Sequence, residues 1–162
     1  MMDDFPNLKN PYHFLATLGG IGKIQLAPGT FGSIFSWLIF IFLSHFMNML
    51  YVTFIGIFLS IWICEMASKN LIQKDHRSIV LDELIGIWIA LLPVVYLADT
   101  QKERTVYAIA ALLFFRIFDI FKPFPVSYFD KNFKNGTGIV IDDLIAGVMA
   151  IIPSCIILTL LA

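Results

Sequence analysis

The chain has 162 residues, of which 59% are hydrophobic and only 14% are charged, and its mean hydropathy is +0.83. This apolar fraction exceeds that of an ordinary soluble domain and indicates a membrane protein. The formal net charge is −1 and the 11 basic residues are spread along the chain, which argues against nucleic acid as a partner.

The N-terminal sequence MMDDFPNLKNPYHF carries acidic residues and has no basic segment ahead of a continuous apolar core. A cleaved secretory signal is therefore not expected. The two cysteines, Cys64 and Cys155, lie inside apolar runs, where a thiol usually acts as a small buried hydrophobe. We expect no disulfide between them.

A glycine-rich segment, GGIGKIQLAPGTFGS, covers residues 19–33 just before the first apolar stretch. It carries Lys23 and ends with Thr30 and Ser33, and backbone N–H groups at such a turn can bind a phosphate. The shorter KNGTG, residues 134–138, has a similar character. Glycine-rich turns before membrane helices are also common as plain connections, so neither segment decides the matter alone.

Five membrane helices are predicted from the apolar runs. Residues 31–67 are too long for one crossing, which takes roughly 20 residues, and the polar SHFMN at 44–48 divides them into two helices. The alternative is a short re-entrant hairpin. Three further spans are predicted at residues 79–98, 105–122 and 139–162. The expected fold is an all-α integral membrane helical bundle that forms a single membrane-embedded domain over residues 1–162.

Pro123 should end the fourth of these helices, because proline cannot continue a helix and restricts the residue before it. The aromatic and basic residues that follow, up to residue 135, suit a segment lying at the membrane surface. A plain amphipathic connector explains the same composition.

Basic residues orient the five-helix arrangement. Eight lie on one side, against Lys102 and Arg104 on the other, so the first side is predicted to be cytoplasmic. The eight are Lys9, Lys23, Lys69, Lys74, Arg77, Lys122, Lys131 and Lys134.

Two segments of the chain are alike: IVLDELIGIWIALLPV at 79–94 and IVIDDLIAGVMAIIPS at 139–154. Each places an acidic pair near its start, Asp82 with Glu83 and Asp142 with Asp143. Together with Asp119, near the end of the fourth helix, all five acids fall at the predicted cytoplasmic end. A carboxylate costs roughly 2.5–3.5 kcal/mol in mid-bilayer and less near the interface, so these groups should need cations.

Simpler explanations exist for these acids. Acidic residues at a helix N-terminus are favoured by the helix dipole, so either pair alone could mark only a helix start. The dipole opposes an anion at the position of Asp119, however. Arg116 and Lys122, three residues to either side, share its helix face, so an internal ion pair is the remaining alternative for it.

Carboxylate oxygens without clustered cysteine or histidine suit Mg²⁺ better than zinc. Protein-bound Mg²⁺ is commonly shared with substrate phosphates, so the pattern favours phosphate chemistry. Other phosphatase chemistries lack their motifs: Asn70 and Leu161 stand where a Cys-x5-Arg loop needs arginine, and there is no Asp-x-Asp and no P-loop.

Four blocks of the sequence carry a resemblance: NPYHFLAT with APGTFGS, VLDELIG, FRIFDIFKPFP, and GTGIVIDDLIAG. In this order they resemble the signature blocks of phosphatidylglycerophosphatase A, a family of bacterial membrane phosphatases, over most of the chain. Arg-x-x-Asp-x-x-Lys-Pro followed by a glycine-rich turn and Asp-Asp is the most specific part. One departure is Asn135–Gly136–Thr137–Gly138, where a Gly-Gly pair is expected.

The resemblance implies Mg²⁺-dependent hydrolysis of phosphatidylglycerophosphate to phosphatidylglycerol and phosphate at the cytoplasmic face of the bacterial inner membrane. One or two Mg²⁺ ions and a general base for water would then come from the five acids, Asp82, Glu83, Asp119, Asp142 and Asp143. The candidates to hold the phosphate are Lys23, Thr30, Ser33, Arg116 and Lys122. His13 is a candidate to protonate the leaving alkoxide, and an interfacial histidine is an equally good interpretation of it.

Two other functions are compatible with buried carboxylates. An ion or proton transporter also uses them, but with acids near the membrane midplane or on both sides. An inactive assembly subunit is the third possibility, which the intact acidic set disfavours.

Overall fold

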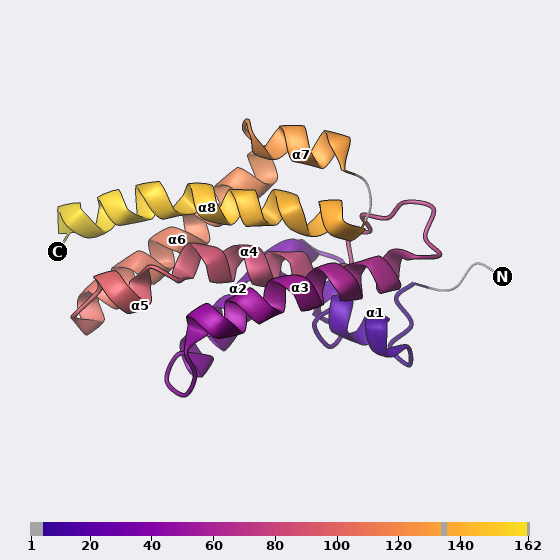
Figure 1. Cartoon of the computed structure of the whole chain (residues 1–162), viewed down its shortest axis with the longest axis horizontal. Coiled ribbons are helices and arrows are strands. Elements are labelled where there is room, and N and C mark those ends of the chain that lie inside the picture. The colour runs from indigo at the N-terminus through magenta and orange to yellow at the C-terminus, as the bar shows by residue number, and fades with distance from the viewer. Residues whose placement is uncertain (1–4, 134–135, 162) are drawn as a thin grey trace.

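The computed structural model describes residues 5–133 and 136–161, and this part of the chain is helical throughout, with no strand (Figure 1). The all-α prediction is confirmed. The elements are α1 (Pro11–Ala16), the 3-10 turn η1 (Ile21–Lys23), α2 (Pro28–Leu43), α3 (Met49–Ser68), α4 (Leu81–Leu91), α5 (Val94–Leu97), α6 (Gln101–Phe121), α7 (Val126–Asn132) and α8 (Gly136–Leu161).

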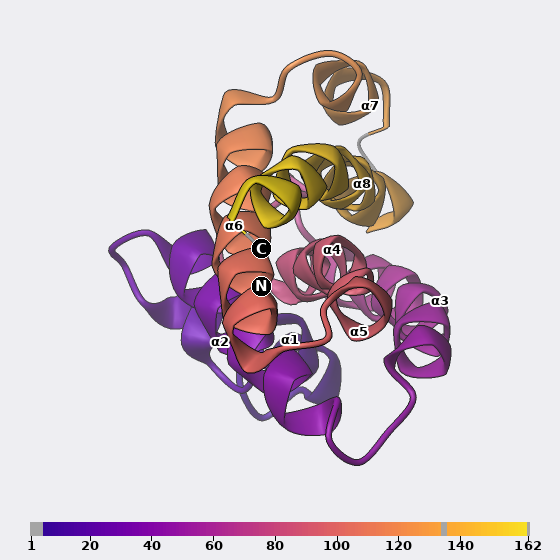
Figure 2. The ribbon, with the colours of Figure 1, turned by 90° about the vertical axis from the view of Figure 1, so that its left-hand side faces the viewer.

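The centre of the bundle is α4. Ten of its 11 residues are buried, as expected for a helix that is apolar on all sides. It packs against α2, α3, α6 and α8, which surround it in the end-on view (Figure 2). Gly86 lets α8 approach closely, because a Cβ at this position would lie 2.8 Å from the carbonyl oxygen of Asp143 and 2.5 Å from the ring of Phe115.

Among the described residues, two helices are long and apolar enough to cross a membrane: α3 with 20 residues and α8 with 26. The apolar α2 has 16 residues and is shorter than a usual span. The predicted span over residues 79–98 is not one continuous helix, since this segment is broken between Leu91 and Val94. Pro93 lies in the break, where it lacks the N–H that a continuing helix needs.

Other boundaries follow the sequence signals. A turn separates α2 from α3 at residues 44–48, as predicted. Helix α6 ends at Phe121, Lys122 adopts a left-handed conformation with φ 44°, and Pro123 follows, so the predicted end is confirmed. The segment after it contains α7, which packs on α8. Both cysteines are free.

One end of the molecule gathers several helix ends. The N-terminal ends of α2, α4 and α8 lie at the same end as the C-terminal ends of α3 and α6, with α1 beside them (Figure 1). The backbone N–H of Val80 donates to the carbonyl of Ala16 at 2.9 Å, which ties the start of α4 to the end of α1. The acidic residues therefore meet here although they are far apart in the sequence.

Candidate active site

The first turn of α2 lies directly against Glu83 of α4. A Cβ added at Gly32 would lie 2.6 Å from Glu83 Oε2, and one at Gly29 would collide with Glu83 Oε1. The absence of side chains at these two positions lets the helix reach the carboxylate. The glycine-rich segment thus has a structural role in the site, while phosphate binding by it stays a prediction.

Arg116 of α6 joins three helices at this point. Its Nη1 lies 2.5 Å from Asp119 Oδ2 and 3.6 Å from Glu83 Oε1. The same nitrogen donates to Ser33 Oγ at 3.3 Å, and Nη2 donates to Thr30 Oγ1 at 3.4 Å. The guanidinium predicted to hold a phosphate therefore has two hydroxyls and two carboxylates around it.

Lys122 forms a second centre next to α8. Its Nζ lies 2.8 Å from Asp142 Oδ2 and also pairs with Asp130 of α7. Partial burial disfavours the charged form, but the hydrogen bonds to Asp130 and Asp142 outweigh this and hold the pKa of Lys122 above its usual range. Lys122 thereby links α7 to the acidic pair of α8.

Asp82 and Asp143 are the acids of the set that have no cation beside them in the described part of the chain. Both side chains are buried, and Asp143 interacts electrostatically with the other four predicted acids. The structure thus brings the five together. Four buried carboxylate oxygens have no hydrogen-bond partner among residues 5–133 and 136–161, which is a costly state for such groups. They are Asp82 Oδ1, Glu83 Oε2, Asp142 Oδ1 and Asp143 Oδ2.

Two further acids belong to this cluster and were missed from the sequence. Asp75, in the loop before α4, interacts electrostatically with Asp82, Glu83 and Asp142. It also lines, with Asp130, a pocket of about 460 Å³ beside the start of α8. Asp75 lies in a polar loop and Asp130 in the short helix α7, so neither lies in one of the long apolar runs. The one sequence signal for Asp130 is that it is an acid in an aromatic connector, eight residues after Lys122.

The balance of charge at this end is strongly negative. Seven carboxylates gather here: Asp75, Asp82, Glu83, Asp119, Asp130, Asp142 and Asp143. The four ion pairs formed between described residues are all in this cluster and use only Arg116 and Lys122. If every group is ionised, seven negative charges face two positive ones, an excess of five. Such a cluster favours the binding of cations.

The donor set fits a hard divalent cation. It consists of oxygens, four of them buried and unpartnered, which is the ligand chemistry of Mg²⁺. No three His, Cys, Asp or Glu side chains of the described residues are arranged to hold one metal ion by themselves. This agrees with the usual coordination of Mg²⁺, which keeps several waters and takes one or two carboxylates plus substrate phosphates.

Two predicted site residues have other surroundings. His13 is buried in α1, where its Nδ1 accepts from the backbone N–H of Asn7 at 3.2 Å and its ring packs edge-on against Phe5. Lys23 is exposed on η1 and forms no ion pair within the described residues. Lys134 and Asn135, from the second glycine-rich turn, lie outside the described residues.

Comparisons with known proteins give the family. The family model described as phosphatidylglycerophosphatase A matches residues 14–158. The chain is 38% identical to phosphatidylglycerophosphatase A of Escherichia coli K12 over 88% of this chain and 81% of that protein. It is 37% identical to phosphatidylglycerophosphatase A of Haemophilus influenzae over 90% and 88%, respectively.

Another relative carries a different name. It is a Bacteroides thetaiotaomicron protein whose name proposes a phosphatidylinositol-3-phosphatase, 35% identical over 90% of this chain and 94% of that protein. No solved structure matches the chain. Two relatives and the family model agree, and the match covers the acidic segments described above. The chain therefore belongs to the phosphatidylglycerophosphatase A family and is a phosphatase.

Proposed function

We propose that this enzyme is a Mg²⁺-dependent phosphatidylglycerophosphatase that releases phosphate from phosphatidylglycerophosphate at the cytoplasmic face of the bacterial inner membrane. The observation that carries the proposal is the excess of buried carboxylates around Arg116 and Lys122 at one end of the bundle. The substrate follows the names of the two relatives. A transporter would distribute its acids through the membrane depth, whereas these seven gather at one end.

The buried acids Asp82, Glu83, Asp142 and Asp143 would hold one or two Mg²⁺ ions through their unpartnered oxygens, with no more than two of these carboxylates on any one ion. The bound metal would neutralise phosphate charge and lower the pKa of a coordinated water. Asp119 is already engaged with Arg116 and would serve to hold that guanidinium in place. Four of the five predicted acids are thus the candidates to bind metal, and the fifth, Asp119, would position the Arg116 side chain.

Arg116 and Lys122 would bind the non-attacked oxygens of the terminal phosphate. A guanidinium can do so in a bidentate way, and Thr30 and Ser33 fix its orientation from α2. Water then attacks phosphorus, the bond to the glycerol oxygen breaks, and the alkoxide takes up a proton. Whichever of Asp82 and Asp143 does not bind the metal ion would accept the proton of the attacking water, and His13 stays the candidate donor to the alkoxide.

The test is phosphate release from phosphatidylglycerophosphate in detergent micelles by the purified protein, with Mg²⁺ or with EDTA. We expect release only with Mg²⁺, and a loss of about 10²–10³-fold in kcat for Asp119→Asn and Asp142→Asn. The matched control is Asp99→Asn, the same change at an exposed acid before α6. Folded wild-type protein that releases no phosphate would contradict the proposal.

A phosphoinositide headgroup is the second candidate, because the Bacteroides relative covers most of this chain. The same assay with phosphatidylinositol 3-phosphate separates the two. We expect the glycerophosphate lipid to give the larger kcat/KM. The reverse order would assign this chain to the inositol lipid while leaving the metal chemistry intact.

A further inference from the structure

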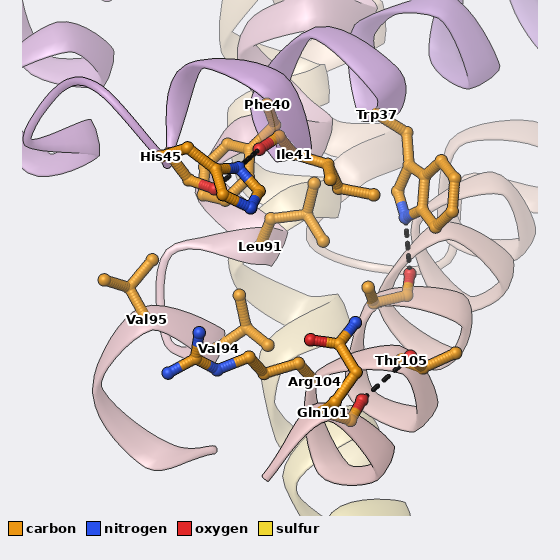
Figure 3. A pocket seen from close by; sticks show the side chains of 12 residues that line it. Trp37, Phe40, Ile41, His45, Leu91, Val94, Val95, Gln101, Arg104 and Thr105 are labelled. Atoms are coloured by element: carbon orange, nitrogen blue, oxygen red, sulfur yellow. Dashed lines mark hydrogen bonds between the residues drawn. The ribbon is translucent and has the colours of Figure 1, made fainter. Parts of the chain in front are cut away.

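A cavity of about 350 Å³ lies between α2, the junction of α4 with α5, and the start of α6, at the opposite end of the bundle from the acids (Figure 3). This volume is in the range of small-molecule sites. Its floor is apolar and closed, since Phe40, Leu91 and Ala108 are buried. Its rim is polar and includes the exposed Gln101 and Arg104.

The walls of this cavity are fixed by the fold. It lies at the break around Pro93, where Leu91 and Val94 line it from the two sides. Across it, Trp37 Nε1 of α2 donates to the carbonyl of Ala108 in α6 at 2.9 Å. This hydrogen bond joins α2 to α6 and fixes the Trp37 ring in the cavity wall.

The charge of the cavity is of one sign. The 12 described residues that line it include Arg104 and no carboxylate. Arg104 Nε donates to the carbonyl of Ala98 at 3.2 Å, which fixes the side chain, while its two terminal nitrogens have no hydrogen-bond partner among the described residues. Figure 3 shows the Gln101 amide on the α6 side of the space, while the Arg104 side chain reaches from α6 toward Val94, so that its guanidinium lies beside α5, across from His45. Donors are thus available above an apolar floor.

We propose that this cavity binds one anionic phospholipid, with its phosphodiester on Arg104 and Gln101 and an acyl chain on the floor formed by Phe40, Leu91 and Ala108. Charge complementarity selects the anionic lipid, because a cationic rim without carboxylates gains more from a net negative headgroup than from a zwitterionic one. The site is separate from the acidic cluster and binds a lipid without hydrolysing it. The inference rests on the membrane placement of the bundle and is independent of the phosphatase reaction.

Trp37 in the cavity wall provides the readout. Protein is reconstituted into phosphatidylcholine vesicles that contain a small fraction of spin-labelled phosphatidylglycerol or spin-labelled phosphatidylcholine, and quenching of tryptophan fluorescence is compared. The background is Trp62→Phe, because Trp62 is exposed on α3 whereas Trp88 is buried. We expect a preference for the anionic lipid of about fivefold, the contribution of one basic residue beside an anionic headgroup.

Two variants decide whether the cavity is responsible. Arg104→Gln should remove the preference, so that the two spin-labelled lipids quench the tryptophan fluorescence of this variant about equally. Lys102→Gln removes the same charge two residues away, outside the cavity, and should leave the preference unchanged. Equal quenching by both lipids, or equal loss in both variants, would overturn the proposal. Wild-type protein checks the membrane placement separately, since exposed Trp62 should be quenched by either lipid once the bundle is embedded.

Discussion

Two segments with nearly the same sequence pattern, residues 79–94 and 139–154, behave alike at their starts and differently at their ends. Each acidic pair lies in the N-terminal part of a helix and is buried in the same cluster. The first segment breaks before Pro93, whereas α8 continues through Pro153 to Leu161. Equivalent prolines therefore give different results in one protein.

The carbonyl groups one turn before each proline have different partners in the two segments. Ala90 and Ala150 occupy equivalent positions, and both carbonyls receive a side-chain hydrogen bond. Ala150 receives it from Ser154 of the same helix at 2.6 Å, whereas Ala90 receives it from Tyr107 of α6 at 3.1 Å. A helix can bend or break at proline wherever the freed groups find other partners. In the first segment the partner comes from another helix, so packing rather than local sequence decides where α4 ends.

The acidic pairs also differ in their partners. Glu83 lies beside Arg116 and Asp142 beside Lys122, while Asp82 and Asp143 have no such cation within the described residues. Each pair thus contributes one acid beside a cationic side chain and one acid that has no such partner within residues 5–133 and 136–161. The four predictions below test this division and the helix contacts behind it.

The largest effect is expected for Asp143→Asn. Loss of an unpartnered carboxylate that we propose as a metal ligand should lower kcat by about 10²–10³-fold. The same change should raise the free energy of unfolding in EDTA by about 1–3 kcal/mol, because it removes a buried charge from among like charges. Phosphate release and thermal unfolding in detergent measure the two effects. A variant that is both inactive and less stable would point to a structural role instead.

A smaller loss, about 10- to 100-fold in kcat/KM, is expected for Asp130→Asn. Asp130 pairs with Lys122, which in turn contacts Asp142, so it acts by positioning. We expect the loss mainly in KM, since Lys122 keeps its charge but is held less firmly. Asp99→Asn again serves as the control, and unchanged kinetics for Asp130→Asn would remove Asp130 from the site.

Gly86→Ala should destabilise the fold by about 1–3 kcal/mol through overpacking. Its new Cβ would lie 2.5 Å from the ring of Phe115 and 2.8 Å from the Asp143 carbonyl, so α4 and α8 must separate. Ala146 is the equivalent position of the second segment. The comparison variant is Ala146→Gly, which should lower the free energy of unfolding by only about 1 kcal/mol through its lower helix propensity. Equal effects in thermal unfolding would show that the crossing of α4 and α8 is not tight.

The smallest effects are expected for substitutions that remove the hydrogen bonds near Pro93 and Pro153. Tyr107→Phe should lower the free energy of unfolding by about 1–2 kcal/mol, because it leaves the buried Ala90 carbonyl without its partner from α6. Ser154→Ala should cost about 0.5 kcal/mol or less, since Ala150 lies inside a continuous helix. Denaturation in the same detergent compares them, and a larger cost for Ser154→Ala would contradict the account of the break.

Several contacts of the site were predictable because they depend on local signals. Arg116 and Asp119 share a helix face at a spacing of three residues, and they form an ion pair. The contacts that complete the site join distant residues: Thr30 reaches Arg116 across 86 positions of the chain. No sequence pattern in α2 or in α6 predicts this contact, because it forms only when α2 packs beside α6.

The sequence by itself determined the helical class, the acidic first turn of α4 and the end of α6 before Pro123, because apolar runs and proline act within a few residues. Helix α8 instead begins at Gly136, ahead of the predicted start of its span at residue 139, so Asp142 and Asp143 lie beyond its first turn. Only the tertiary structure decided that α4 ends before Pro93 while α8 passes Pro153, and that Asp75 and Asp130 join the five predicted acids. The physical reason is the same in each case. A buried carbonyl or carboxylate takes whichever partner the packed helices bring to it, and that partner is set by the fold rather than by the neighbouring residues.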